Sequence, residues 1–208
     1  MKMKFPALLF AVAFLSMSAI AQNASPVPSI SQLLPPPLPA GVNSAVYPAP
    51  RQDWVQRVQS DNERARKQTG IRLIFDGDSI TDRWLVAGTQ IWQERYEKIG
   101  AFDFGISGDR TQHLLWRLAQ GQVDGIQPRL VALMIGTNNL GGNSVDEIAA
   151  GVTAIVRDYQ TRCPGAVILL QGIFPRGKDA NDPLRAKIKA VNAIIARLNA
   201  KQIPTTQA

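Results

Sequence analysis

Four short apolar runs, separated by segments with helical patterning, constrain the fold of this chain more than any other feature. The runs cover residues 71–75, 102–106, 130–135 and 166–170, and polar or glycine residues follow each of them. Short apolar runs alternating with helices are typical of parallel strands that are covered on both faces. The sequence therefore predicts an α/β fold with an open, doubly wound parallel sheet. Ligands of such sheets bind beyond the carboxyl ends of the strands.

The segments between the runs predict the helices that cover the sheet. Residues 53–68 and 111–119 have amphipathic patterns, and Ser144 with Glu147 forms a capping box at the start of another helix. A final apolar stripe recurs at helical spacing from Leu184 to Leu198. We interpret these apolar positions as core packing.

The N-terminal part of the chain predicts export followed by a spacer. Two lysines precede an apolar stretch that ends in the small-x-small sequence Ala19-Ile20-Ala21. This pattern predicts a signal peptide over residues 1–21 and export to a periplasm or to the outside medium. Residues 22–50 are rich in proline and are predicted to be a spacer without a packed core. Residues 51–208 are predicted to form the folded domain.

Composition excludes several classes of protein. The chain has one cysteine, Cys163, and one histidine, His113, which excludes an internal disulfide, a multi-cysteine zinc site and a histidine-rich metal centre. The formal net charge of +7 is not combined with an aromatic-interleaved basic stripe, so we expect no nucleic-acid partner. No long apolar run follows the N-terminus, so we expect no membrane span after signal cleavage. Nothing in the sequence indicates an oligomeric state.

Polar residues follow three of the predicted strands. They form the segments Asp76–Thr81, Gly105–Asp109 and Gly136–Asn139. Because carboxyl ends of parallel strands lie on one rim of a sheet, we expect these segments to meet. Single loops of this kind are usually helix caps or turns, but three at successive strand ends indicate a site.

The residue types on this rim suit the stabilisation of an oxyanion. Ser79 is expected where a strand turns into a helix, with its hydroxyl exposed near the positive helix N-terminus. Gly108 can offer an unobstructed backbone N–H, and Asn138 can offer a side-chain amide. Together with the N–H of Ser79, these groups supply three donors to one point, and each donor is typically worth about 3–4 kcal/mol in the transition state.

These residues carry a resemblance to a known family. Several segments match in order: Gly77-Asp78-Ser79, Gly108, Gly136-x-Asn138, Phe104–Leu118, Phe174–Gly177 and Asn181–Arg185. The first three resemble the leading sequence blocks of the SGNH (GDSL-type) hydrolase family, and the longer segments resemble its branch of platelet-activating-factor acetylhydrolase catalytic subunits.

The resemblance implies a three-layer α/β/α, flavodoxin-like fold and serine esterase chemistry. It assigns Ser79 as the nucleophile, and Ser79 N–H, Gly108 and Asn138 as the oxyanion hole. It implies no metal ion or other cofactor. The implied substrate is a small-molecule ester, a lipid or an acetylated sugar.

The sequence departs from the family after the fourth strand. The family carries a later Asp-x-x-His block, whose histidine is the general base, and no histidine follows Asp182 here. We therefore expect a domain that is incomplete before the fifth strand and last helix, an exposed apolar edge on the fourth strand, and severely reduced hydrolysis. His113 falls in a predicted helix, where a structural role is favoured over a rescue role in catalysis.

Two alternatives remain open at this stage. The segment from Leu73 to Ile80 is similar to the start of haloacid-dehalogenase-type phosphatases, in which Asp76 would attack phosphorus and Asp78 would act as acid and base. The missing histidine also fits an exported binding protein on a degenerate hydrolase scaffold.

Overall fold

The computed structural model describes residues 38–201, with side chains as far as residue 198. The predicted signal peptide, the first part of the predicted spacer and residues 202–208 lie outside this range. Within it, none of the helices combines the length and the apolar character needed to cross a membrane.

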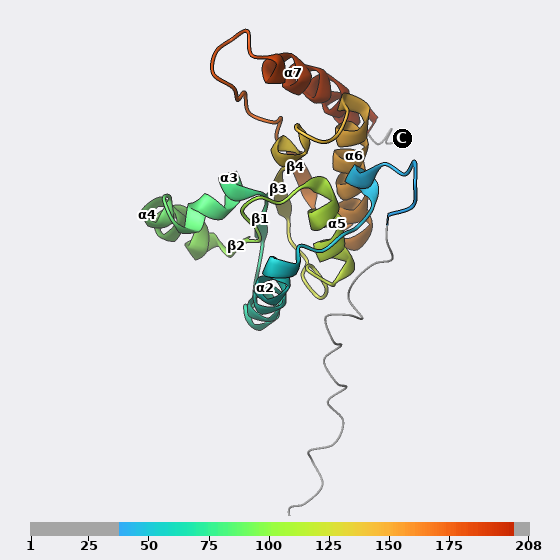
Figure 1. Cartoon of the computed structure of the whole chain (residues 1–208). Helices are drawn as coiled ribbons and strands as arrows, with labels where there is room; N and C mark the ends of the chain where they lie inside the picture. Colours follow the sequence, from blue (N-terminus) through green and yellow to red (C-terminus); the bar gives the residue numbers. More distant parts are fainter. Residues whose placement is uncertain (1–37, 202–208) are drawn as a thin grey trace, which may run out of the picture.

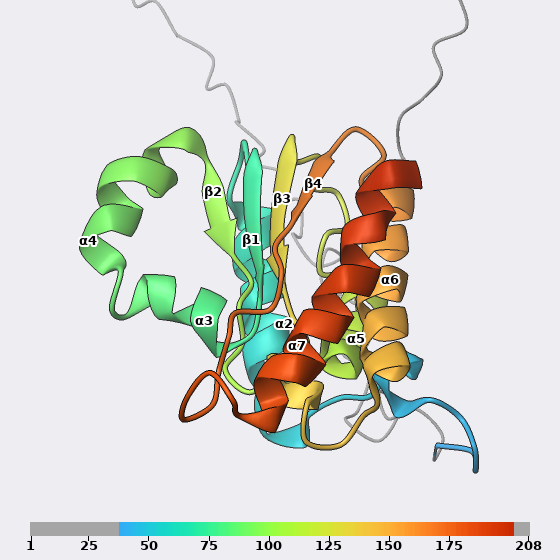
Figure 2. The ribbon, with the colours of Figure 1, turned by 90° about the horizontal axis from the view of Figure 1, so that it is seen from above.

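A parallel sheet of four strands forms the centre of the molecule (Figures 1 and 2). The strands are β1 (Leu73–Gly77), β2 (Ala101–Asp103), β3 (Leu130–Met134) and β4 (Val167–Leu170). They lie in the order β2-β1-β3-β4, and every neighbouring pair is parallel. The order reverses between β1 and β3, which is where open α/β sheets bind their ligands. The predicted α/β fold class is confirmed.

Helices cover the sheet on both faces. Their bounds are α2 (Val55–Lys67), α3 (Ser79–Asp82), α4 (Thr89–Ile91), α5 (Thr111–Ala119), α6 (Val145–Arg162) and α7 (Pro183–Ile195). Helices α2, α5, α6 and α7 contribute to the main core, in which Ile74 of β1 and Val131 of β3 are fully buried. The predicted capping box of Ser144 and Glu147 is present at the start of α6.

The opposite face is covered by the segment between β1 and β2, which Figures 1 and 2 show away from α5 to α7. Besides α3 and α4 it contains three short turns: η3 (Arg83–Leu85), the π-helical η4 (Trp92–Tyr96) and η5 (Glu97–Ile99). Phe75 of β1 anchors it, because the Phe75 ring centroid lies 5.3 Å from that of Trp92 and 4.9 Å from that of Tyr96. This aromatic cover was not anticipated from periodicity.

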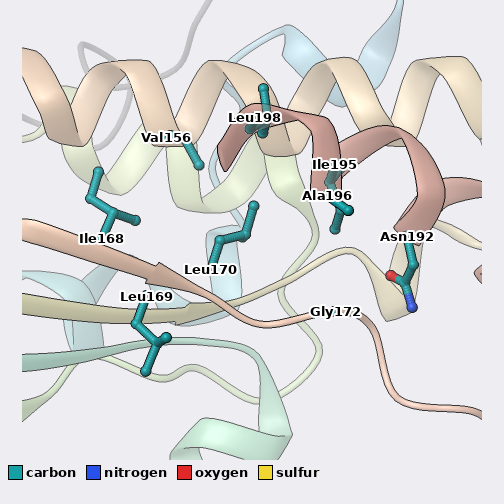
Figure 3. Close-up of a pocket in the computed structure, with 9 residues that line it drawn as sticks. All are labelled: Val156, Ile168, Leu169, Leu170, Gly172, Asn192, Ile195, Ala196 and Leu198. Atoms are coloured by element: carbon teal, nitrogen blue, oxygen red, sulfur yellow. The ribbon is translucent and has the colours of Figure 1, made fainter. Parts of the chain in front are cut away.

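Strand β4 lies at the edge of the sheet, and one of its faces is uncovered. Val167 and Leu169 are 66% and 51% exposed. The register places Leu169 in one row with Ala132 and Phe75, on the face whose aromatic cover stops short of β4. The other face of β4 borders an apolar pocket of about 410 Å³ against α6 and α7 (Figure 3). The predicted exposed apolar edge is therefore present.

The end of the predicted spacer packs on the domain. Asn43 caps the turn η1 (Ser44–Val46) by accepting the N–H of Ala45 at 2.8 Å. Ala45 is fully buried, and its carbonyl accepts a hydrogen bond from the Thr111 hydroxyl at 2.8 Å. The folded unit thus begins before the predicted boundary at residue 51, because a capped turn can bury a small side chain even in a proline-rich segment.

Candidate active site

The nucleophile loop follows β1. Asp78 is the N-cap of α3, and its Oδ1 accepts the N–H of Ile80 at 3.0 Å. Ser79 is the first residue of α3 and is half-buried. A side chain at Gly77 would collide with the carbonyl oxygen of Met134 on β3, so only glycine lets the loop leave the sheet this closely. The local sequence therefore turns the chain sharply and presents Ser79 at the carboxyl rim.

The second loop follows β2 and makes a tight turn. The N–H of Asp109 donates to the carbonyl of Ile106 at 3.1 Å, and Gly108 has a φ of +84°. These are the features of a type II turn, which requires positive φ at its third residue. Gly108 is exposed, and its N–H has no hydrogen-bond acceptor among the described residues. The N–H of Gly108 is thus available to a ligand.

The third loop follows β3 as the turn η6 (Thr137–Asn139). The Asn138 side-chain Nδ2 donates to the carbonyl of Asp109 at 2.8 Å, which joins the third loop to the second. The neighbouring Asn139 is fully buried, and its Oδ1 accepts the N–H of Thr111 at 3.0 Å. Asn138 and Asn139 therefore divide their roles, with Asn138 on the rim and Asn139 holding the start of α5.

The structure brings the three sequence-predicted residues to one rim. Ser79, Gly108 and Asn138 follow β1, β2 and β3, which are neighbours in the sheet. The Asn138–Asp109 hydrogen bond joins two of these loops, and Gly105 contacts α3, where a Cβ would collide with the Asp82 N–H. The Ser79 hydroxyl, like the Gly108 N–H, makes no hydrogen bond with any described residue, whereas the Asn138 amide is bonded to Asp109.

A buried charged network lies beneath the rim. Arg117 of α5 is 2% exposed, and it donates from Nη2 to Asp76 Oδ1 at 3.0 Å and from Nε to Asp109 Oδ2 at 2.9 Å. Gln122 and the Tyr159 hydroxyl donate to the other oxygen of Asp76. The network ties the end of β1 to the Gly108 loop, to α5 and to α6.

Burial shapes the protonation of this network. It raises the pKa of Asp109 to about 6, although the adjacent Arg117 opposes the shift. It also raises the pKa of Tyr159 well above its ordinary value, with the Asp76 charge adding to the effect. Asp76 is fully buried and its carboxylate oxygens are engaged, so it is not accessible to a phosphate group. This geometry argues against the phosphatase alternative.

His113 is held in a local capping arrangement at the start of α5. Its Nδ1 accepts the N–H of Arg110 at 3.0 Å, and it lies 3.7 Å from Asp109 Oδ1. In a serine hydrolase triad the histidine Nδ1–H donates to the aspartate, whereas here Nδ1 is an acceptor. Burial, followed by the charges of Arg51, Arg110 and Arg117, lowers the pKa of His113 to about 4. His113 is therefore neutral at pH 7 and is oriented by the helix start.

Two residues that support this site, Arg51 and Arg117, were not predicted from the sequence. Arg51 contacts the Gly108 loop from a position far earlier in the chain, and no local pattern marks it. Arg117 had a weak signal, since it is a cation among the apolar residues of a predicted helix. Within residues 38–201 the structure holds no group of three or more histidine, cysteine, aspartate or glutamate side chains suited to a metal ion.

The fold and the rim define a class of protein: a doubly wound α/β protein with a serine at the first strand-to-helix turn. The model of the GDSL-like Lipase/Acylhydrolase family matches residues 75–205, well over half of the sequence. The chain therefore belongs to this family.

Three similar proteins illustrate the relationship. The platelet-activating factor acetylhydrolase IB subunit alpha2 of Rattus norvegicus is 41% identical over 123 residues, which cover 59% of this chain and 52% of that protein. The alpha1 subunit of Homo sapiens is 36% identical over 162 residues, covering 74% and 67%. A solved member of the lipolytic protein G-D-S-L family from Veillonella parvula superposes with a TM-score of 0.54 at 19% identity, covering 62% and 73%. The chain spans about half the length of the alpha2 subunits that it matches.

Proposed function

We propose that this chain carries the nucleophile and the oxyanion hole of an exported serine ester hydrolase. Ser79 Oγ attacks the carbonyl carbon of an ester, and the alcohol leaves from the resulting tetrahedral intermediate. The N–H groups of Ser79 and Gly108 and the side-chain amide of Asn138 stabilise the negative oxygen of that intermediate. Water then releases the acyl group from Ser79.

One observation carries the proposal. The Gly108 N–H has no acceptor among the described residues, while Asn138, two loops away from Ser79 in sequence, is bonded to the carbonyl of the residue next to Gly108. An exposed N–H at the third residue of a type II turn has no acceptor within the turn and is free to bind a ligand in place of water. An open donor fixed beside an amide, on the rim that also carries a serine at a helix start, suits a developing oxyanion.

Removal of the Ser79 hydroxyl proton is the step that we expect to limit this chemistry. The sequence contains a single histidine, His113, whose Nδ1 is already an acceptor for Arg110. Because His113 is the only histidine of residues 38–201 and its Nδ1 is held by Arg110, we expect the serine proton to pass to water or hydroxide, and turnover to be slow and to rise with pH. Loss of the catalytic histidine alone lowers turnover by roughly 10⁶ in another serine hydrolase.

Acetyl esters are the proposed substrate class, borne by a small molecule, a lipid or a sugar. The names of the curated relatives support this choice, since they describe acetylhydrolases. Export to a periplasm or to the outside medium is proposed from residues 1–21 alone. Ile80 is 39% exposed next to Ser79, so the rim also offers apolar surface to an acyl group.

A second function is favoured by the same missing base. A chain that retains an oxyanion hole without a base can bind esters without cleaving them. The two functions differ in one measurable property: turnover that depends on Ser79.

Hydrolysis of p-nitrophenyl acetate between pH 6 and pH 10 tests the proposal. After subtraction of the buffer blank at each pH, we expect slow release of p-nitrophenol that rises with pH, is abolished in Ser79→Ala, and falls by about 10²–10³ in Asn138→Ala, the usual effect of losing one oxyanion donor. His113→Gln is the control and should retain the wild-type rate. Ester binding without Ser79-dependent turnover would favour the binding protein, and a rate typical of an ordinary esterase would contradict the absence of a base.

A further inference from the structure

The side chain of Arg51 lies against the loop that carries Gly108. Arg51 Nη1 donates to the carbonyl of Ser107 at 2.5 Å and lies 3.6 Å from the Asp109 carboxylate. A Cβ built at Gly108 would lie 2.8 Å from the same Nη1. The guanidinium thus contacts three consecutive residues of this loop.

The carbonyl that Arg51 holds belongs to the peptide group that bears the Gly108 N–H. A trans peptide is planar, so its C=O and N–H point in opposite directions. With the Ser107 oxygen directed at Arg51, the Gly108 N–H is directed away from the guanidinium. The type I turn, the main alternative for this backbone, requires the same peptide to flip. Arg51 therefore selects the orientation of the donor.

The contact also changes the strength of that donor. A charged group that donates to a carbonyl polarises the whole amide, and hydrogen bonds in such chains strengthen one another by roughly 10–30% each. We propose that Arg51 is a positioning residue that fixes and polarises the Ser107–Gly108 peptide, so that the Gly108 N–H serves as an oxyanion donor. This inference rests on the proposed function.

Other contacts keep Arg51 in place. Its Nη2 lies 3.2 Å from Asp53 Oδ2, and its guanidinium carbon lies 5.3 Å from the centroid of the Trp54 ring. Its side chain is only 23% exposed. Arg51 also precedes residues 75–205, the part of the chain that the family model matches. The contact therefore joins the segment before α2 to the loop that follows β2.

The Gly108 amide resonance in a ¹H–¹⁵N spectrum tests positioning without any need for catalysis. We expect Arg51→Ala to move the Gly108 amide proton and nitrogen upfield, since the polarising cation is lost. Arg51→Lys should restore most of the shift because an ammonium can donate to the same carbonyl. Arg64→Ala, which removes an exposed cation paired with Asp61, should leave the Gly108 resonance unchanged.

Phosphonylation of Ser79 by a p-nitrophenyl alkylphosphonate tests the consequence for reactivity. Ser79 Oγ forms a bond to phosphorus, p-nitrophenolate leaves, and at pH 9 hydroxide takes the serine proton. We expect Arg51→Ala to slow this reaction about tenfold, less than the 10²–10³ of a deleted oxyanion donor, because Arg51 orients the donor and does not supply it. Arg51→Lys should react within about threefold of wild type.

Two results separate the proposals. If the Gly108 resonance and the phosphonylation rate of Arg51→Ala both equal those of Arg64→Ala, the positioning role of Arg51 is wrong. If wild-type Ser79 is not phosphonylated at all, the proposed function fails, and the Gly108 resonance alone still decides whether Arg51 polarises this peptide.

Discussion

Two regions of the sheet are built in opposite ways: the carboxyl ends of β1 and β2, and the edge strand β4. At the carboxyl ends of β1 and β2, the loops rest on fully or almost fully buried charges, with Asp76 0% and Arg117 2% exposed. At β4, apolar side chains face outward, with Val167 66% and Leu169 51% exposed. We refer to these as the network side and the β4 side. Polar groups are buried where a site must be held, and apolar groups are exposed where the sheet has an edge.

This difference predicts which region is sensitive to single substitutions and which tolerates them. A buried ion pair rarely adds much net stability, but removing one partner strands the other without compensation. The network side should therefore be sensitive to single changes of charge. The β4 side is held mainly by the apolar stripe of α7, including Ile188, Val191 and Ile195, and its outer face should tolerate substitution.

The largest effect is expected from Arg117→Met. The change leaves Asp76 and Asp109 buried without their shared cation, so it should lower the free energy of unfolding by about 3–5 kcal/mol. Arg162→Met is the matched control, since Arg162 and its two partners, Asp158 and Asp124, are all at least partly exposed. That control should change stability by less than about 1 kcal/mol. Urea denaturation measures both, and similar losses in the two variants would contradict the comparison.

The second test uses Asp103, at the end of β2. Its Oδ1 accepts the N–H of Gly105 at 2.6 Å, while its Oδ2 has no partner. Burial raises the pKa of Asp103 to about 7, and the charges of Asp76 and Asp82 add to the effect. Because the folded pKa exceeds the unfolded value near 4, the contribution of Asp103 to stability is greatest below pH 4 and falls as pH rises towards 7.

Asp103→Asn should remove this pH dependence. Relative to wild type, the variant should gain about 2 kcal/mol of stability between pH 5 and pH 8, since the aspartate no longer has to ionise in a buried site. Denaturation curves at intervals of one pH unit provide the measurement. A constant difference between the two proteins across this range would show that Asp103 does not titrate as the structure implies.

The smallest change in stability is expected at the β4 edge. Leu169→Thr on the outer face should alter the free energy of unfolding by less than about 0.5 kcal/mol, as surface substitutions usually do. It should nevertheless reduce self-association, because exposed apolar edge strands promote pairing between chains. Light scattering against protein concentration measures this, with Ala132→Thr on the same register row as a buried comparison. Equal scattering by Leu169→Thr and wild type would show that the exposed face of β4 does not cause self-association.

The parts of the fold with local signals were predicted well from the sequence. The bounds of α5 at Thr111 and Ala119 agree with the prediction, and the Ser144–Glu147 capping box is present. Strands β1, β3 and β4 overlap the predicted runs over most of their length, whereas β2 (Ala101–Asp103) ends at residue 103 and the rest of the predicted run 102–106 belongs to the loop that follows it. The cover over residues 79–99 was not predicted, because its short helical and π-helical turns are stabilised by tertiary packing on Phe75 and not by periodicity.

The candidate site was predictable only in part, for the same reason. Ser79, Gly108 and Asn138 each follow a strand, so sequence order alone brings them to one rim. Arg51 reaches Ser107 across 56 positions of sequence, and Arg117 reaches Asp76 across 41. Contacts of that range leave no local pattern, so the supports of the rim became visible only in three dimensions.

In the proposed function, Ser79 is a nucleophile that faces an oxyanion hole and has no histidine placed as its base among the described residues. Intact-mass analysis after treatment with a p-nitrophenyl alkylphosphonate at pH 7 and pH 9, followed by peptide mapping, tests it most directly. We expect one adduct, on Ser79, that forms slowly at pH 7, forms faster at pH 9, and is absent in Ser79→Ala. An adduct that persists in Ser79→Ala, or a Ser79 adduct that forms at the same fast rate at both pH values, would contradict it.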